Sequence, residues 1–140
     1  RILALREGLP PKIIKVKSDE LLKVTAEQIN DLMMQFPSAI NAVITLDEIK
    51  TRDELRKSDW TYDGRENILM KDEKRMRVLR PEEARGLEFD AVVVVEPSDF
   101  PEKVGRHGTL YTSLTRANQE LVVVHSKPLP QQLHNRSNRH

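Results

Sequence analysis

The sequence contains no cysteine. Disulfide bonds, thiol catalysis and zinc sites built on cysteine are therefore excluded. A long apolar run is also missing: the longest, at residues 91–95, is far below the roughly 18–20 residues that a membrane-spanning helix needs. Aromatic residues are only 4% of the chain. Trp60 and Tyr62 are therefore more simply explained by packing in a hairpin than by stacking on nucleic-acid bases.

Net charge is small as well, because 23 basic residues face 22 acidic ones for a formal charge of +1. No strong global field directs the chain to nucleic acid or to a membrane. Residues 1–6 have neither a Met nor the apolar stretch of a signal peptide. We expect a cytoplasmic segment of a longer protein, without a membrane partner.

The 140 residues amount to about one domain. In the first half, β-branched stretches alternate with segments of helical periodicity. We expect a strand at 12–17, a helix from about 21 to 36, a strand at 39–46 and a short helix at 47–57. Asp63 and Gly64 then indicate a hairpin turn. The charged residues 71–74 are expected to form a solvated loop.

The second half continues this alternation. We expect a strand at 76–79, a first helical turn at 81–84, a strand at 90–96, a helix around 110–117 and a strand at 121–125. The unbroken valine run at 92–95 is typical of a central strand that is buried on both faces. Alternating strands and helices favour an α/β fold with a mainly parallel sheet and crossover helices.

Two short segments carry a resemblance to a known family. They are residues 83–90 (EARGLEFD) and residues 110–117 (LYTSLTRA), and each is followed by an expected strand. Together they resemble motifs V and VI of superfamily 1A helicases, the UvrD/Rep group, which usually read (A)KGLEFD and (L)Y(V)A(L)TRA. The order of the motifs and the spacing of about twenty residues agree with that group. The resemblance covers residues 76–125.

This resemblance implies the second, C-terminal RecA-like domain of such a motor, a three-layer α/β domain of the P-loop NTPase type. No G-x-x-x-x-G-K-[ST] phosphate cradle occurs in the sequence, and its five glycines are scattered. ATP and Mg²⁺ are thus expected to be held mainly by an N-terminal P-loop domain outside this chain, which alone should be inactive. We expect the domain at 1–126 and a disordered polar tail at 127–140.

The residues of motif V resemble those of one branch of the group. Where DNA-translocating members carry a His four residues before the motif V Gly, this chain has Glu82. Residues 81–90 (PEEARGLEFD) and the ending at 123–130 (VVHSKPLP) are similar to HelD-type proteins, relatives that release RNA polymerase from stalled complexes. A carboxylate at this position would repel a phosphate backbone. RNA polymerase is therefore the favoured partner and DNA the alternative.

The resemblance also assigns a nucleotide site. Arg116 corresponds to the arginine finger, whose planar guanidinium can hold two γ-phosphate oxygens. Gly86 and Glu88 correspond to nucleotide-binding positions, with the Glu88 carboxylate on the ribose. The purely structural alternatives are a surface ion pair for Arg116, a turn that needs Gly86 for its backbone, and local capping by Glu88.

Three further residues complete the predicted site. Tyr111 is assigned to the nucleotide side, although packing in the core is an alternative. Arg85 and Thr112 are assigned to nucleic acid; Arg85 could instead pair with Glu82 or Glu83. No metal ligands are expected in this chain. We expect the cleft at the carboxyl ends of the parallel strands, where open α/β sheets bind their ligands.

Three functions remain open at this point. The first is an ATP-cleft domain of a HelD-type motor that acts on RNA polymerase, and the second is the same domain in a UvrD-like repair helicase that moves along single-stranded DNA. The third is a RecA-like module that binds protein and takes no part in ATP turnover, since fold alone does not fix function.

Overall fold

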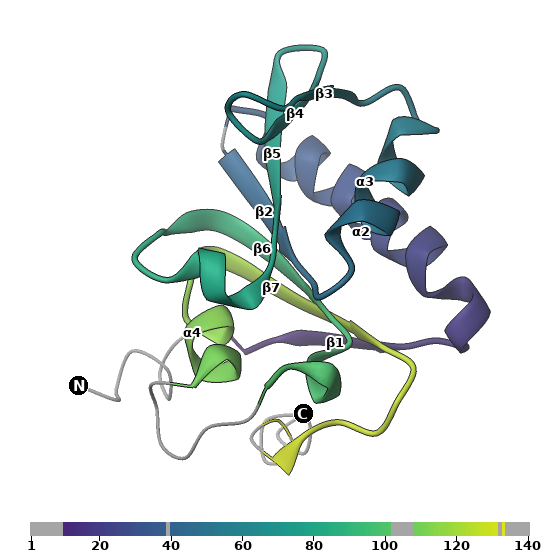
Figure 1. Cartoon of the computed structure of the whole chain (residues 1–140), viewed down its shortest axis with the longest axis vertical. Coiled ribbons are helices and arrows are strands. Elements are labelled where there is room, and N and C mark those ends of the chain that lie inside the picture. Colours follow the sequence, from purple (N-terminus) through teal and green to yellow (C-terminus); the bar gives the residue numbers. More distant parts are fainter. Residues whose placement is uncertain (1–9, 39, 102–107, 132, 134–140) are drawn as a thin grey trace.

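The computed structural model describes residues 10–38, 40–101, 108–131 and 133 (Figure 1). Its centre is a seven-stranded sheet in the order β1-β7-β6-β2-β5-β4-β3. The first five strands of that order run parallel, and β4 and β3 extend one edge as antiparallel strands. The strands are β1 (Lys12–Lys15), β2 (Ile40–Ile44), β3 (Thr61–Asp63), β4 (Ile68–Lys71), β5 (Lys74–Leu79), β6 (Phe89–Val95) and β7 (Ala117–His125).

Helices cover both faces of this sheet, which gives three layers (Figure 1). Helices α2 and α3 pack on one face, whereas η2 and α4 pack on the other. The expected α/β fold with a mainly parallel sheet is confirmed. The helices are η1 (Ser18–Glu20), α2 (Leu21–Gln35), α3 (Glu48–Arg56), η2 (Pro81–Ala84), η3 (Pro97–Asp99) and α4 (Thr109–Leu114).

Strand β6 lies inside the sheet and is buried on both faces, as its valine run predicted. Val93 and Val95 pack into the cluster that contains the apolar face of α2. Val92 and Val94 point the other way and pack with Leu110 of α4. A strand that faces helices on both sides has no solvent face, so its sequence shows no polar alternation.

The β3–β4 hairpin is confirmed, with Tyr62 opposite Leu69. The expected loop at 71–74 is wrong, because β4 and β5 continue to Lys71 and Lys74 and pair there. Only Asp72 and Glu73 form the turn, and both have positive φ, 50° and 68°. Two left-handed residues are what a tight two-residue hairpin requires.

The prediction of a disordered tail from residue 127 is wrong for its described part, 127–131 and 133. The Leu133 side chain is fully buried, and Leu129 packs against the same cluster, on the side of α4. A backbone hydrogen bond from Leu133 to Pro130 closes a turn that directs Leu133 inward. Because most residues of the tail are polar, the sequence pattern did not predict that these two leucines pack against the core.

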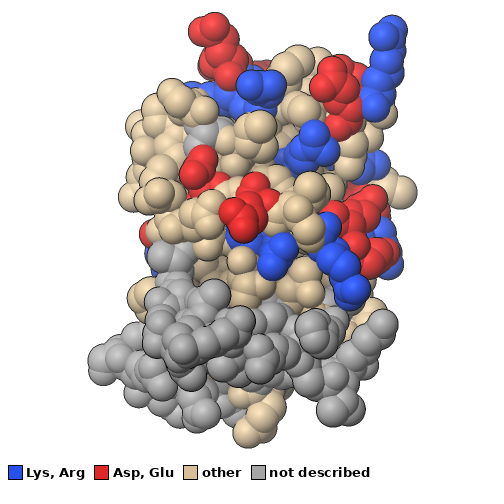
Figure 2. Space-filling view, turned by 90° about the vertical axis from the view of Figure 1, so that its left-hand side faces the viewer, with Lys and Arg blue, Asp and Glu red and all other residues tan. Residues whose placement is uncertain are grey.

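Charges of both signs are mixed on one face of the molecule. On the face shown in Figure 2, Lys and Arg side chains lie among Asp and Glu side chains rather than in one patch of a single sign. This distribution agrees with the formal charge of +1. No helix in the described part of the chain combines the length and apolar character needed to cross a membrane.

Replacing Leu133 by Ala should lower the free energy of unfolding by about 2–5 kcal/mol, because it leaves a cavity in a close-packed cluster. Urea unfolding followed by circular dichroism measures this change. Met34→Ala is the control, since Met34 is 78% exposed, and it should cost less than about 0.5 kcal/mol. If Leu133→Ala matched the control, the tail would not belong to the core.

Candidate functional site

The two motif segments meet at one edge of the sheet. The segment with Gly86 and Glu88 leads into β6, and the segment with Arg116 leads into β7. These strands are parallel neighbours that begin at the same level, with Phe89 opposite Ala117. The backbone N–H of Phe89 donates to the Arg116 carbonyl oxygen at 2.9 Å. The pairing of β6 with β7 therefore brings together residues that are about thirty positions apart in sequence.

This edge is formed by the amino ends of β6 and β7, so the expectation of a cleft at the carboxyl ends is wrong for these residues. The reason lies in the sequence itself: Gly86, Glu88 and Arg116 all precede a strand, and in a parallel sheet the residues before neighbouring strands share the amino edge. A bulge follows in β7, where the pairing shifts from Phe89–Ala117 to Ala91–Glu120. Such bulges redirect the side chains beside them.

Within the described residues, the Arg116 guanidinium donates three hydrogen bonds, all to neutral oxygens. Nε donates to the carbonyl oxygen of Thr112 at 3.0 Å, and Nη2 to the hydroxyl oxygen of Thr115 at 3.2 Å. Nη1 reaches the other motif and donates to the carbonyl oxygen of Leu87 at 3.2 Å. No ion pair among the described residues includes Arg116. The guanidinium is thus fixed in place, and no carboxylate in the described part of the chain pairs with it.

Gly86 allows the backbone turn that places the Leu87 carbonyl against Arg116. Its φ is +81°, a conformation that side chains with a Cβ rarely adopt. A Cβ there would meet no heavy atom within 4 Å, so the requirement is backbone conformation rather than space. The turn continues with a hydrogen bond from the Leu87 N–H to the Ala84 carbonyl at 3.1 Å. The carbonyl of Leu87 then faces Arg116, and Glu88 lies exposed beside it.

The other predicted residues are Arg85, Thr112 and Tyr111, and the structure describes the side chains of the first two. Arg85 is exposed and ends η2. Thr112 is buried within α4, and its carbonyl oxygen accepts from both Arg116 and Thr115. Tyr111 belongs to α4, but its side chain falls outside the described residues. The assignments of these residues to nucleotide or nucleic acid stay predictions.

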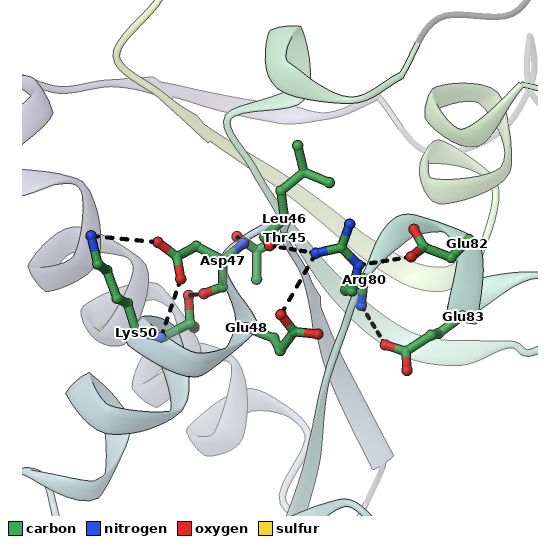
Figure 3. A network of polar contacts seen from close by, with 9 residues as sticks. Thr45, Leu46, Asp47, Glu48, Lys50, Arg80, Glu82 and Glu83 are labelled. Atoms are coloured by element: carbon green, nitrogen blue, oxygen red, sulfur yellow. Dashed lines mark hydrogen bonds and ion pairs between the residues drawn. The ribbon is translucent and has the colours of Figure 1, made fainter.

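The carboxyl edge of the sheet carries a different arrangement, centred on Arg80 after β5 (Figure 3). Its Nε donates to Glu82 at 2.7 Å, and its Nη1 donates to the Leu46 carbonyl at 2.9 Å and lies 3.7 Å from Glu48. The Glu83 carboxylate accepts from the Arg80 backbone N–H at 2.7 Å. The hydrogen bond from Arg80 lowers the pKa of Glu82. Sequence reasoning singled out Glu82 but missed its partner.

Glu96 follows β6 and lies at the same carboxyl edge of the sheet. It has a φ of 54° and is 8% exposed. Its carboxylate accepts from the backbone N–H groups of Ser126 and Lys127, at 2.9 and 3.0 Å, and from the Ser126 hydroxyl. Burial raises the pKa of Glu96, but these hydrogen bonds outweigh burial, and the net pKa lies below its usual 4.5.

A pocket of about 250 Å³ lies between the carboxyl ends of β2 and β6. Its acidic lining residues, Asp47, Glu96 and Asp99, already have partners: Asp47 caps α3, and Asp99 pairs with Lys127 at 2.6 Å. None of the predicted site residues is among the described residues that line it. In the described part of the chain, no three His, Asp or Glu side chains are grouped to hold a metal ion.

Comparison with known proteins supports the resemblance of the motif pair to UvrD-like helicases. Residues 82–124, which contain both motifs, match the profile of the UvrD-like helicase C-terminal domain. The resemblance seen in the sequence is thereby confirmed over this segment. No curated protein matches the chain.

Solved structures share the fold. The C-terminal domain of a possible DNA helicase from Lactobacillus plantarum WCFS1 superposes with a TM-score of 0.69 at 22% identity, over 96% of this chain and 84% of that one. The large terminase ATPase domain of Thermus phage P74-26 gives a TM-score of 0.52 at 14% identity, over 86% of this chain and 61% of that one. A mutant of that terminase domain gives 0.54 at 13% identity, over 90% and 64%. These likenesses establish the RecA-like α/β fold.

Proposed function

We propose that this chain is the C-terminal ATP-cleft domain of an ATP-dependent superfamily 1 helicase. In this function Arg116 serves as the arginine finger for ATP and Mg²⁺ that are held mainly by an N-terminal P-loop domain outside the chain. Gly86, Glu88 and Tyr111 contribute nucleotide contacts, with Glu88 on the ribose. Arg85 and Thr112 lie on the nucleic-acid side.

The state of the Arg116 guanidinium supports this function best. An arginine at the end of a helix commonly donates to the last carbonyl oxygens of that helix, as Arg116 does to Thr112. Arg116 also donates to the Leu87 carbonyl of the other motif, so three neutral acceptors from both motifs orient it. Catalysis of phosphoryl transfer consists mostly of positioning and of charge stabilisation, and a preoriented cation supplies both.

The division of labour between two domains follows from what the sequence contains. It has no phosphate cradle of its own, so hydrolysis requires a second domain that holds the triphosphate. ATP that bridges the two domains binds the closed arrangement more tightly than the open one, and this difference in affinity drives closure. The domain therefore works as the moving half of a motor.

For the output of the motor we favour HelD-type recycling of cytoplasmic RNA polymerase over translocation along single-stranded DNA. Glu82 occupies the position of a DNA-contacting His in the translocating relatives, and it is paired with Arg80. A cation that is already neutralised attracts phosphate weakly, and the nearby carboxylates Glu48 and Glu83 add to the repulsion. A UvrD-like DNA translocase is the alternative. A non-catalytic protein-binding module is disfavoured by the preoriented Arg116.

Replacing Arg116 by Ala in the full-length protein should lower kcat for ATP hydrolysis by about 10³–10⁵-fold, because transition-state charge loses its partner. The KM for ATP should change far less, since the finger acts on the transition state. Steady-state kinetics measure both, and Arg56→Ala, an exposed arginine at the end of α3, is the control. An unchanged kcat in Arg116→Ala would refute the arginine-finger role.

Single-stranded DNA should not stimulate the ATPase of the full-length protein at low salt. Glu82→Gln should strengthen binding of the DNA, because it frees Arg80 to meet a phosphate. Glu66→Gln, which removes an exposed carboxylate from the β3–β4 connection, is the matched control. Fluorescence anisotropy with labelled oligonucleotide measures binding. Strong stimulation of the unmodified protein would favour the UvrD-like alternative, and binding to purified RNA polymerase would favour the HelD-type output.

A further inference from the structure

Thr115, the residue before Arg116, shares hydrogen bonds with it and with Thr112. The Thr115 hydroxyl donates to the carbonyl oxygen of Thr112 at 3.1 Å. The same hydroxyl accepts from Arg116 Nη2 at 3.2 Å, while Arg116 Nε donates to that same Thr112 carbonyl at 3.0 Å. Thr112, Thr115 and Arg116 are thus linked in a ring at the end of α4.

The ring fixes the direction of the hydroxyl. A hydroxyl group has one hydrogen to donate and two lone pairs that accept. Because the hydrogen of Thr115 is directed at the Thr112 carbonyl, a lone pair is left to face the guanidinium. The hydroxyl and the carbonyl then form a two-oxygen platform for Nε and Nη2, which lie on the same edge of the planar guanidinium.

The third bond completes the orientation from outside α4. Arg116 Nη1 donates to the Leu87 carbonyl in the other motif. The three bonds use three of the five N–H groups of a guanidinium. Among the described residues, no acceptor takes the remaining N–H on each terminal nitrogen. These two N–H groups are available to contact two oxygens of a phosphoryl group.

We propose that Thr115 is a positioning residue for Arg116, which it orients so that the two remaining N–H groups of the guanidinium face the transferring phosphoryl group. Thr115 itself touches no substrate. This role rests on the proposed function of Arg116, but the orientation of the guanidinium is a property of the isolated chain and can be tested there.

Thr115→Val and Thr115→Ser test the role of the hydroxyl. Val has nearly the shape of Thr but cannot accept a hydrogen bond, whereas Ser keeps the hydroxyl. Thr25→Val is the matched control, because the Thr25 hydroxyl also donates to a backbone carbonyl of its own helix, that of Leu21 at 2.7 Å, on the opposite face of the sheet. Both Val variants lose a hydroxyl that donates to a backbone carbonyl, and Thr115→Val also loses the oxygen that accepts from Arg116 Nη2.

The first readout is the Arg116 Nη2–H signal in the NMR spectrum of the 140-residue chain. In the unmodified chain and in Thr115→Ser we expect slow exchange of this proton with water, because Nη2 is held on the Thr115 hydroxyl. Thr115→Val should lose the slow exchange, whereas Thr25→Val should keep it. Retention of slow exchange in Thr115→Val would overturn the proposal, whatever the function of Arg116.

The second readout is ATP hydrolysis by the full-length protein. Thr115→Val should lower kcat about tenfold with KM unchanged, the effect expected from one lost hydrogen bond to a charged group. Thr115→Ser should restore kcat, and Thr25→Val should keep it once both Val variants are compared at equal folded fraction. A normal kcat in Thr115→Val, alongside a strong defect in Arg116→Ala, would refute the positioning role alone. If Arg116→Ala were also normal, the proposed function itself would fail.

Discussion

The parallel pairing of β6 with β7 is the constraint on which the rest of the structure depends. Both strands are fully buried over their valine stretches, from Val92 to Val95 and from Val122 to Val124. A shift in their register would expose or misplace these side chains on both faces of the sheet. The pairing also places Phe89 beside Ala117, and so determines that the loop before β6 and the end of α4 meet. The candidate site is a direct consequence of core packing.

Charged side chains at the two edges of the sheet have different kinds of partner. At the carboxyl edge, Arg80 is paired with Glu82, and the buried Glu96 is satisfied by donors from Ser126 and Lys127. At the amino edge, the described residues that hold Arg116 do so through neutral oxygens. Polar groups at the carboxyl edge therefore serve the fold, because they join strand ends and anchor the chain after β7. At the amino edge Arg116 is oriented by these bonds, and in the proposed function it binds an anionic phosphoryl group.

Much of the fold could be predicted from the sequence because its signals are local. The valine run of β6, the helical periodicity before Pro37 and the Asp63–Gly64 turn each depend on neighbouring residues. Features that depend on tertiary contacts were missed. Leu133 looks like one apolar residue in a polar tail, and its burial follows from packing beside α4. The motif pair indicated Arg116, but its hydrogen bond to the Leu87 carbonyl follows only from the register of β6 and β7.

The most direct test of the central claim is a structure of the full-length protein with ADP, Mg²⁺ and aluminium fluoride, which mimics the transferring phosphoryl group. The measured quantity is the distance between the Arg116 terminal nitrogens and the fluoride atoms. Our account predicts about 3 Å, a hydrogen-bonding distance, with Nε still on the Thr112 carbonyl. A nucleotide bound in the P-loop domain with Arg116 directed away from it would contradict the account.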